Sequence, residues 1–122
     1  MANAKFFELW DWQESHNCLL KIYEVTRNFP PEEKYNLISQ IRSAALSIPS
    51  NIAEGTGRGS KKDLVRFLII ARGSVEEVLS HLYIAKSLKY LNEENYQELF
   101  GRYNKLAKAI NNHIFSIQKG EN

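Results

Sequence analysis

The sequence predicts an all-α protein, an antiparallel up-down-up-down four-helix bundle. Four long segments repeat apolar residues at spacings of three and four, which is the period of an amphipathic α-helix. The connections between these segments are short and contain proline, glycine or asparagine. Short connections place consecutive long helices side by side and antiparallel, so that the four apolar stripes can enclose one core.

The first two helices are expected at about residues 7–28 and 31–54. The first stripe comprises Leu9, Trp12, His16, Leu19, Tyr23 and Thr26. The second stripe comprises Ile38, Ile41, Ala45, Ile48 and Ile52. Because this second stripe keeps its phase on both sides of Pro49, one helix bent at the proline is favoured over two separate helices. The glycine-rich segment 55–59 is expected to form the stop and turn.

The third and fourth helices have recognisable start signals. Ser60 and Asp63 resemble a capping box, and the helix that follows is expected to reach about residue 89. Asn92 can cap the fourth helix, which is expected to end at Lys119-Gly120. The third stripe comprises Leu64, Leu68, Ala71, Val75, Val78, Leu82 and Ala85. The fourth comprises Tyr96, Leu99, Tyr103, Leu106, Ile110, His113 and Ile117.

Length and composition indicate one domain over residues 1–122, with 43% hydrophobic and 25% charged residues. The longest apolar run, residues 67–71, is too short to span a membrane, and the N-terminus lacks an export signal, so a cytoplasmic location is expected. Cys18 is the single cysteine, which excludes an intramolecular disulfide and fits a reducing compartment. Burial of Cys18 is favoured over a reactive thiol, which would need an activating neighbour.

Two classes of site are disfavoured by the spacing of the residues. A di-metal site in a four-helix bundle needs glutamate three residues before histidine, and none of His16, His81 and His113 has one. No metal or other cofactor is therefore expected, and His16 and His113 are interpreted as hydrogen-bonded core or interface residues. The segment 55–62 also fails the spacing of phosphate-binding loops and follows a helix rather than a strand, so nucleotide binding is not expected. No small-molecule substrate is expected either.

The basic turn is the candidate nucleic-acid-binding site. Residues 57–122 contain eleven Lys or Arg against seven Asp or Glu, whereas residues 1–56 contain five against seven. Free N–H groups at the start of the third helix, together with nearby cations, can bind the phosphates of a nucleic-acid backbone. The residues are Arg58, Lys61, Lys62 and Arg66. The alternative is a basic turn that only faces water.

A second set of polar residues is interpreted as a structural layer between the second and third helices. Buried polar groups must be paired, and a paired set fixes the register of two helices. The set comprises Ser47, Asn51, Glu54, Arg72, Ser74 and Glu77. Catalysis by Glu54 or Ser47 would need a positioned base, and no histidine is evident near either residue. We therefore expect no catalytic residue and no enzymatic activity.

Aromatic residues and two helical glycines point to contacts beyond one chain. Gly73 and Gly101 lie inside predicted helices, where close helix–helix approach in the bundle or across a subunit contact would offset their cost. Aromatic side chains exceed what a bundle of this size is expected to bury, and surplus aromatics commonly lie in oligomer interfaces. The candidate interface residues are Phe6, Trp10, Trp12, Phe100 and Phe115. The alternative is that they cap the end of the bundle.

Residues 12–91, about two-thirds of the chain, resemble the bacterial four-helix-bundle proteins encoded in intervening sequences of 23S ribosomal RNA genes, a ribosomal-protein-like family. The most specific match is SIPSNIAEG at residues 47–55, supported by Trp12-Gln13, Phe29-Pro30, Gly57-Arg58 and Gly73-Ser74. The resemblance implies a left-handed antiparallel bundle and a homo-oligomer, typically a five-fold ring. More distantly, the chain resembles the accessory variability proteins of diversity-generating retroelements, which act with nucleic acid and a reverse transcriptase.

These observations favour a non-enzymatic, oligomeric helical bundle that binds structured RNA through backbone phosphates. The alternative is a protein–protein adaptor without nucleic-acid binding, which would dock through its aromatic end and fourth helix. A third hypothesis, an enzyme with a site around Glu54 and Arg72, requires a base that the sequence does not indicate.

Overall fold

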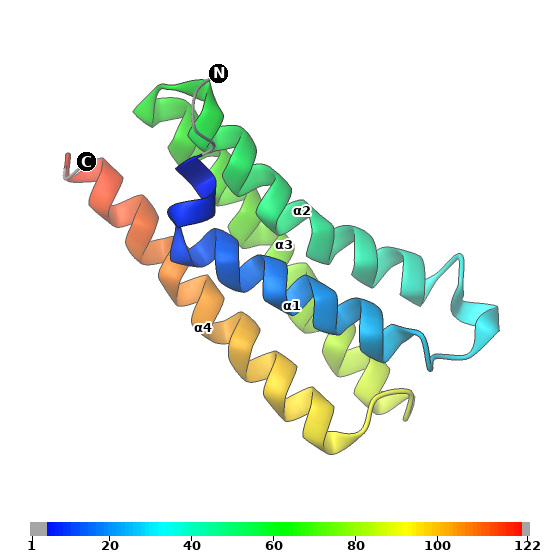
Figure 1. Cartoon of the computed structure of the whole chain (residues 1–122). Coiled ribbons are helices and arrows are strands. Elements are labelled where there is room, and N and C mark those ends of the chain that lie inside the picture. Colours follow the sequence, from blue (N-terminus) through cyan, green and yellow to red (C-terminus); the bar gives the residue numbers. More distant parts are fainter. Residues whose placement is uncertain (1–4, 121–122) are drawn as a thin grey trace.

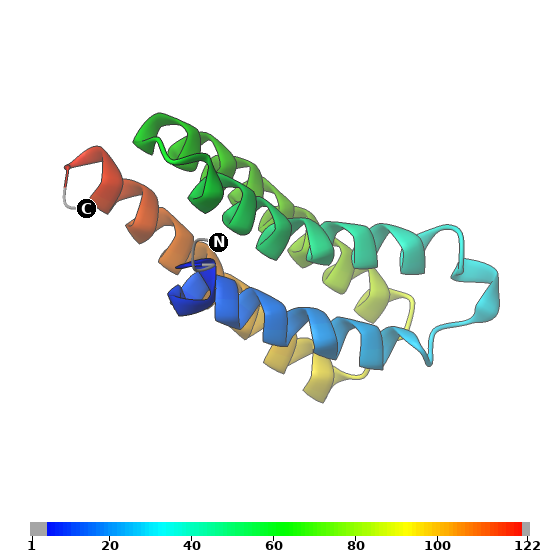
Figure 2. The ribbon, with the colours of Figure 1, turned by 45° about the horizontal axis from the view of Figure 1, so that its top comes forward.

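The computed structural model describes residues 5–120, and in this range the protein is helical and contains no strand. Its elements are η1 (Lys5–Glu8), α1 (Trp10–Thr26), η2 (Pro31–Glu33), α2 (Leu37–Arg58), α3 (Lys61–Ser87) and α4 (Glu93–Gln118). Consecutive long helices run in opposite directions along a common axis (Figures 1 and 2). The predicted all-α four-helix bundle is confirmed.

Each long helix packs against two others, so the four helices surround one core. Helix α1 contacts α2 and α4, and α3 contacts the same two helices from the opposite side. The stripes predicted for α2, α3 and α4 supply most of the buried side chains, which form one contiguous cluster. The largest of the fully buried residues on these stripes are Ile41, Ile48, Ile52, Leu68, Leu82, Leu99, Tyr103, Leu106 and Ile110.

The stripe predicted for the first helix needs a correction. The innermost face of α1 is formed by residues on the neighbouring stripe: Asp11, Ser15, Cys18, Ile22 and Val25. Trp12, His16 and Leu19 are half-buried and line a hollow against α2, and only Thr26 of the predicted set is fully buried. This stripe was not predicted because two of its five positions are polar. Ser15 donates to the carbonyl of Trp12 in the same helix, whereas the partner of Asp11 lies on α4 and cannot be read from the pattern of α1.

Helix α2 continues through Pro49, as expected, but it ends four residues later than predicted. It passes through Gly55 and Gly57 to Arg58, and the chain turns at Gly59, whose φ of 85° is left-handed. A left-handed glycine directly after the last helical residue is a common way for a helix to end. At its other end, the segment predicted to start at Pro31 forms the short η2 turn first, and α2 begins only at Leu37.

The two predicted caps are present and set the starts of α3 and α4. The Ser60 hydroxyl accepts a hydrogen bond from the backbone N–H of Asp63 at 3.1 Å. The Asn92 side-chain oxygen accepts from the backbone N–H of Asn95 at 2.7 Å. Each cap satisfies one of the N–H groups that a helix start leaves without an internal partner.

Gly55 allows α2 and α3 to approach each other closely near the turn. A Cβ atom placed on Gly55 would lie 2.8 Å from Cβ of Phe67 and 3.2 Å from Cδ1 of Leu64. The same construction at Gly73 and Gly101 meets nothing within 4 Å, and both glycines are exposed. Close approach inside the bundle, the first alternative for these two glycines, was therefore wrong, and Gly55 has that role. The second alternative, a subunit contact, stays a prediction.

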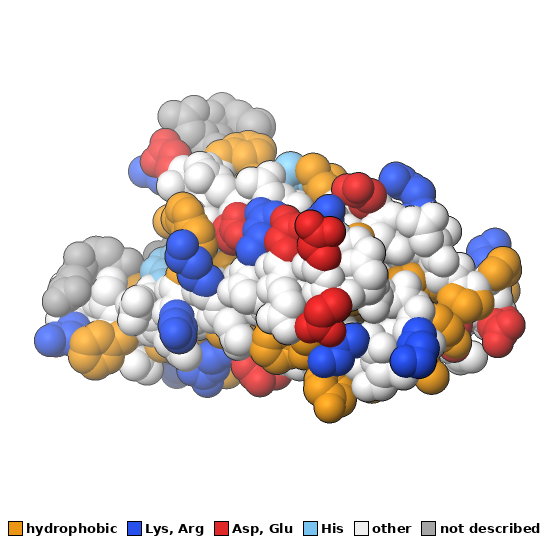
Figure 3. All heavy atoms as spheres, turned by 90° about the horizontal axis from the view of Figure 1, so that it is seen from below, with side chains coloured by type: hydrophobic (Ala, Val, Ile, Leu, Met, Phe, Trp, Pro, Cys, Tyr) orange, Lys and Arg blue, Asp and Glu red, His pale blue; other side chains and the backbone are white. Residues whose placement is uncertain are grey.

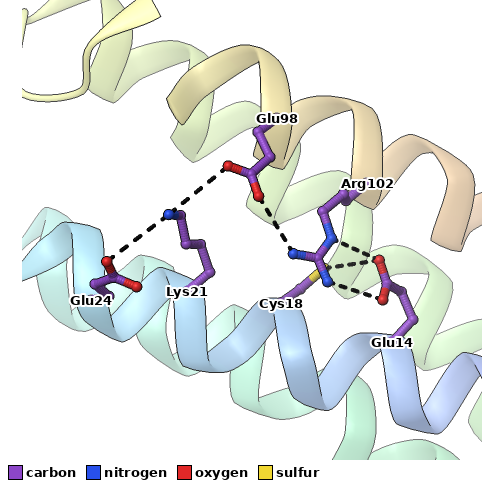
Figure 4. Close-up of polar contacts among 6 residues, drawn as sticks. All are labelled: Glu14, Cys18, Lys21, Glu24, Glu98 and Arg102. Atoms are coloured by element: carbon purple, nitrogen blue, oxygen red, sulfur yellow. Dashed lines mark hydrogen bonds and ion pairs between the residues drawn. The ribbon is translucent and has the colours of Figure 1, made fainter. Parts of the chain in front are cut away.

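Helices α1 and α4 are joined by a polar clamp that the sequence did not reveal (Figure 4). The Glu14 carboxylate accepts two hydrogen bonds from the Arg102 guanidinium, at 2.8 Å from Nε and 3.0 Å from Nη2. Glu98 lies 3.7 Å from Nη1 of the same guanidinium and 3.9 Å from Nζ of Lys21. A two-point contact of this kind fixes geometry as well as adding attraction.

Cys18 is fully buried beside this clamp, as expected for the single cysteine. Its thiol donates to Glu14 at 3.7 Å. Burial, reinforced by the negative charge of Glu14, raises the pKa of the thiol to about 12. The thiolate, which is the reactive form of cysteine, is therefore scarce near neutral pH.

Replacing Gly55 with alanine should destabilise the fold by about 1–3 kcal/mol, because the added methyl group collides with the Cβ of Phe67 and forces α2 and α3 apart. Gly57→Ala is the matched control. Gly57 is exposed in the same helix, with open space around it, so alanine there should stabilise the protein by about 0.5–1 kcal/mol. Urea unfolding measures both values, and equal stability of the two variants would contradict the close approach.

Glu14→Gln should lower the free energy of unfolding by about 1–2 kcal/mol at pH 7, because it removes the charge that Arg102 pairs with. The hydrogen bonds from Arg102 hold the pKa of Glu14 below its ordinary value of 4.5. The clamp therefore stabilises the folded state above that value, and its contribution disappears as the pH falls through the lowered pKa.

Urea unfolding of both proteins at several pH values between 7 and about 3 measures this dependence, and the difference between wild type and Glu14→Gln should shrink on the acid side. Glu24→Gln is the control, because the Glu24 side chain is 65% exposed and its contact with Lys21 is long, at 4.0 Å. It should change stability by less than about 0.5 kcal/mol at any of these pH values. A difference that stays constant with pH would rule out the ionised clamp.

Candidate nucleic-acid interface

The α2–α3 turn gathers the predicted cations at one end of the bundle. Arg58 is the last residue of α2, Lys61 and Lys62 are the first residues of α3, and Arg66 follows about one turn later. All four side chains are exposed. Figure 1 shows this turn at the end of the bundle where α1 starts and α4 ends. We call these four residues the basic turn.

The two arginines of the basic turn are held in place by neighbouring groups. Arg58 donates from Nε to Glu54 at 2.9 Å, and Arg66 donates from Nη2 to Asp63 at 3.4 Å. Both guanidinium groups also lie over the ring of Phe67, at 5.1 Å and 4.5 Å from its centre. These contacts neutralise part of the arginine charge, but each guanidinium has five N–H donors and uses only one in these hydrogen bonds.

The two lysines of the basic turn carry its unpaired charge. In the described part of the chain, neither Lys61 nor Lys62 forms an ion pair. They border a shallow hollow of about 300 Å³ together with Val65, Ile117 and Gln118. The end of α4 therefore lies beside the two lysines and borders the same hollow. The sequence showed that α4 ends in Lys119, but not that this end lies beside the start of α3.

The structure brings together three of the six residues predicted for the polar layer. The Ser47 and Ser74 hydroxyls lie 2.9 Å apart, and Asn51 donates from Nδ2 to the carbonyl and hydroxyl oxygens of Ser47 at 2.8 and 2.9 Å. The remaining three residues, Glu54, Arg72 and Glu77, do not join this set.

Each of those three longer side chains points elsewhere. Glu54 is exposed and binds Arg58, and Glu77 is exposed on α3. Arg72 donates to the side-chain oxygen of Asn111 on α4 at 2.8 Å. The prediction of a six-residue layer between α2 and α3 is thus corrected to a three-residue contact, because longer side chains at the edge of a helix interface can reach water or another helix.

The five aromatic residues predicted for an oligomer interface lie on different faces. Phe6 and Trp12 pack together, with ring centres 5.0 Å apart, and line a hollow of about 290 Å³ between α1 and α2. Phe100 lies between α3 and α4, in contact with the ring of Tyr96. Trp10 and Phe115 are the most exposed of the five, at 46% and 60%. They therefore form several separate apolar patches instead of one.

The sequence analysis missed a buried pair between α1 and α4. Nδ1 of His113 lies 2.7 Å from an oxygen of Asp11, whose side chain is 5% exposed. The prediction that His113 is a hydrogen-bonded histidine on an apolar stripe agrees with this contact, but its partner was not identified. Both residues border a hollow of about 300 Å³ with Leu9, Trp10, Ala109 and Asn112. The sequence signal that could have identified the partner is Asp11, an acidic residue in the first turn of α1.

Residues 5–120 contain neither a metal-binding cluster nor a membrane-spanning helix. No three His, Cys, Asp or Glu side chains in this range gather into a group that could hold a metal ion. In the same range, no helix is both long and apolar enough to cross a bilayer.

These features define a small antiparallel helical bundle with a cationic turn at one end. The chain belongs to the 23S rRNA-intervening sequence protein family, whose model matches residues 8–112. A solved structure from Bacteroides thetaiotaomicron, described as a protein with unknown function from the S23 ribosomal protein family, has a similar fold with a TM-score of 0.77. It shares 21% sequence identity, and the match covers 85% of this chain and 97% of that one. No curated protein sequence gives a significant match.

Proposed function

We propose that this protein is a non-enzymatic, self-assembling helical scaffold that binds structured RNA through backbone phosphates at the basic turn. The observation that carries the proposal is the pair of lysines at the start of α3, Lys61 and Lys62, which have no acidic partner in the described part of the chain. Beside them, two arginines are held by Phe67 with most of their N–H donors unused.

The start of α3 adds donors to these cations. The hydroxyl of Ser60 occupies the N–H of Asp63, and no hydrogen bond involves the backbone N–H of Lys61 or Lys62 in the described structure. Free N–H groups and the positive end of the helix dipole both attract a phosphate. Because phosphate contacts release counterions, binding at this turn should weaken steeply as the salt concentration rises.

Apolar side chains on opposite faces of the bundle support self-assembly. One hollow lies between α1 and α2 and includes Trp12 and Leu46; another, of about 470 Å³, lies between α3 and α4 and includes Tyr83 and Ile84. Elsewhere, apolar side chains reach the surface at several places between charged ones (Figure 3). Contacts between two different faces of identical chains repeat head to tail, and such contacts close into a ring when the rotation permits.

A ring would also strengthen the basic turn. Each chain has a formal net charge of only +2, which is modest for a nucleic-acid-binding protein. Cyclic symmetry places every copy of the turn on one rim, so that one RNA can contact several turns at once. Linked contacts of this kind raise the overall affinity without any new contact within a subunit.

A protein–protein adaptor is the second candidate function. It is supported by the exposure of Trp10 and Phe115, which a partner protein could cover. An enzyme centred on Glu54 and Arg72 is less well supported, because Glu54 is paired with Arg58 and Arg72 with Asn111. Neither contact provides the general base that such a site would need.

Changing Lys61, Lys62 and Arg66 together to glutamate should weaken binding to a hairpin RNA at least tenfold in low salt. The slope of the logarithm of the binding constant against the logarithm of salt concentration should become shallower by about two to three per subunit, since three phosphate contacts are lost. Glutamate is favourable in the first turn of a helix, where Lys61 and Lys62 lie, and it is a good helix former at position 66, so α3 should still form. Fluorescence anisotropy over a salt series measures both quantities.

The matched control reverses three exposed cations in the α1–α2 and α3–α4 connections, which lie at the opposite end of the bundle (Figure 1): Arg27, Lys34 and Lys89. It changes the net charge by the same amount and should retain most of the affinity. If the two triple variants bind equally, the basic turn is not the RNA site. If both retain wild-type affinity and capture of a partner protein depends on Trp10, the adaptor function replaces the RNA-binding one.

Tyr83→Glu should dissociate the assembly, because it places a charge in the hollow between α3 and α4. Tyr83 is 56% exposed, so the isolated bundle should remain folded. The same substitution at Tyr35, which is 83% exposed and lies outside that hollow, should leave the assembly intact. Light scattering gives the molar mass of each protein, and a wild type that is monomeric at all concentrations would refute self-assembly.

A further inference from the structure

We propose that the hollow between the start of α1 and the end of α4 binds an unpaired base of the RNA held at the basic turn. This inference rests on the proposed function and extends it from phosphate contacts to recognition of a base. The hollow has a volume of about 300 Å³ and is bordered by Leu9, Trp10, Asp11, Ala109, Asn112 and His113. We call it the α1–α4 hollow.

The α1–α4 hollow combines an aromatic side chain with polar groups, as base-binding sites do. Trp10 borders it and is 46% exposed, and the exposed part of its indole contributes nothing to the stability of the monomer. Unpaired bases of RNA stack on aromatic side chains and form hydrogen bonds along their edges. A stack of this type is tolerant of sequence, because every base has a π-face.

The buried carboxylate of Asp11 orients the imidazole of His113. An ionised carboxylate can only accept hydrogen bonds, so the 2.7 Å contact assigns the proton to Nδ1 of His113. Nε2 is then the remaining polar atom of the ring, and no hydrogen bond involves it in the described part of the chain. His113 and the exposed Asn112 both border the α1–α4 hollow, and we assign Nε2 and the amide of Asn112 as the polar groups for the edge of a base.

The position of the hollow matches that of the basic turn. His113 lies one helical turn before Ile117, a rise of about 6 Å along α4. Ile117 and Gln118 border the hollow that contains Lys61 and Lys62. A strand whose phosphate lies at the lysines therefore passes the end of α4, where a neighbouring base can turn toward Trp10. This adjacency of the α1–α4 hollow and the basic turn favours a nucleic acid as the ligand, because a partner protein would not need a phosphate site next to a base site.

The test compares two single-stranded probes of equal length and charge, an oligouridylate and an oligomer of abasic ribose phosphate. Trp10→Ala should raise the dissociation constant for the oligouridylate about tenfold, which corresponds to about 1.4 kcal/mol and lies within the range measured for base stacking. It should leave the dissociation constant for the abasic probe unchanged. Trp10→Phe, which retains a smaller aromatic face, should give an intermediate loss. Phe115→Ala is the control, because Phe115 is an exposed aromatic residue outside the α1–α4 hollow.

The outcomes separate this inference from the proposed function. If the charge reversals at the basic turn weaken both probes but Trp10→Ala weakens neither, the base site is refuted and the phosphate site stands. If Trp10→Ala weakens both probes equally and lowers the molar mass of the protein, Trp10 acts in a subunit contact and the inference is overturned. If wild-type protein binds neither probe at low salt and also fails to bind hairpin RNA, both proposals fail together.

Discussion

The close approach of α2 to α3 at Gly55 is the constraint on which the α2–α3 end of the molecule depends. With no side chain on Gly55, the backbone of α2 lies directly against Phe67 and Leu64 of α3. Helix α2 can then continue to Arg58 and reverse at the left-handed Gly59, with Ser60 starting the next helix at once. A wider separation would need a longer connection, and the cations of the turn would spread apart.

The opposite side of the bundle is held by a different kind of interaction. Helices α1 and α4 are distant in sequence and share no connecting turn, and they have the least contact of the four neighbouring pairs. Three polar pairs cross between them: Glu14 with Arg102, Lys21 with Glu98, and Asp11 with His113. Polar pairs of this kind fix the register of helices more than they add stability. The register matters here because it places the start of α1 beside the end of α4, where the α1–α4 hollow forms.

The sequence predicted the parts of this fold that depend on local pattern. The stripes of α2, α3 and α4, the continuity through Pro49 and the caps at Ser60 and Asn92 are all local signals. It failed where the outcome depends on a partner from another helix. The inner face of α1 contains Asp11, whose burial makes sense only with His113 present, and these residues are about one hundred positions apart.

The glycines and the polar layer show the same contrast between local signals, which the sequence contains, and contacts with another helix, which it does not. Gly55 was interpreted as a stop because glycine commonly ends helices. Phe67 and Leu64 opposite it show instead that its lack of a side chain is needed inside the last turn of α2. The hydroxyls of Ser47 and Ser74 form the contact that was expected. A short side chain can contact only the residue directly opposite it, so its partner follows from how the helices pack. Arg72 has several rotatable bonds and donates to Asn111 on α4. The spacing of residues along α3 could not predict which helix this long side chain contacts.

Phe67 links the packing constraint to the charged surface. Its Cβ lies against Gly55, while its ring supports the guanidinium groups of Arg58 and Arg66. A cation that rests on an aromatic ring and a carboxylate has already lost much of its side-chain freedom, so binding a phosphate costs it less entropy than it costs a mobile lysine. The basic turn therefore combines two oriented arginines with two lysines that form no ion pair in residues 5–120, and the orientation of the arginines depends on how closely α2 and α3 pack.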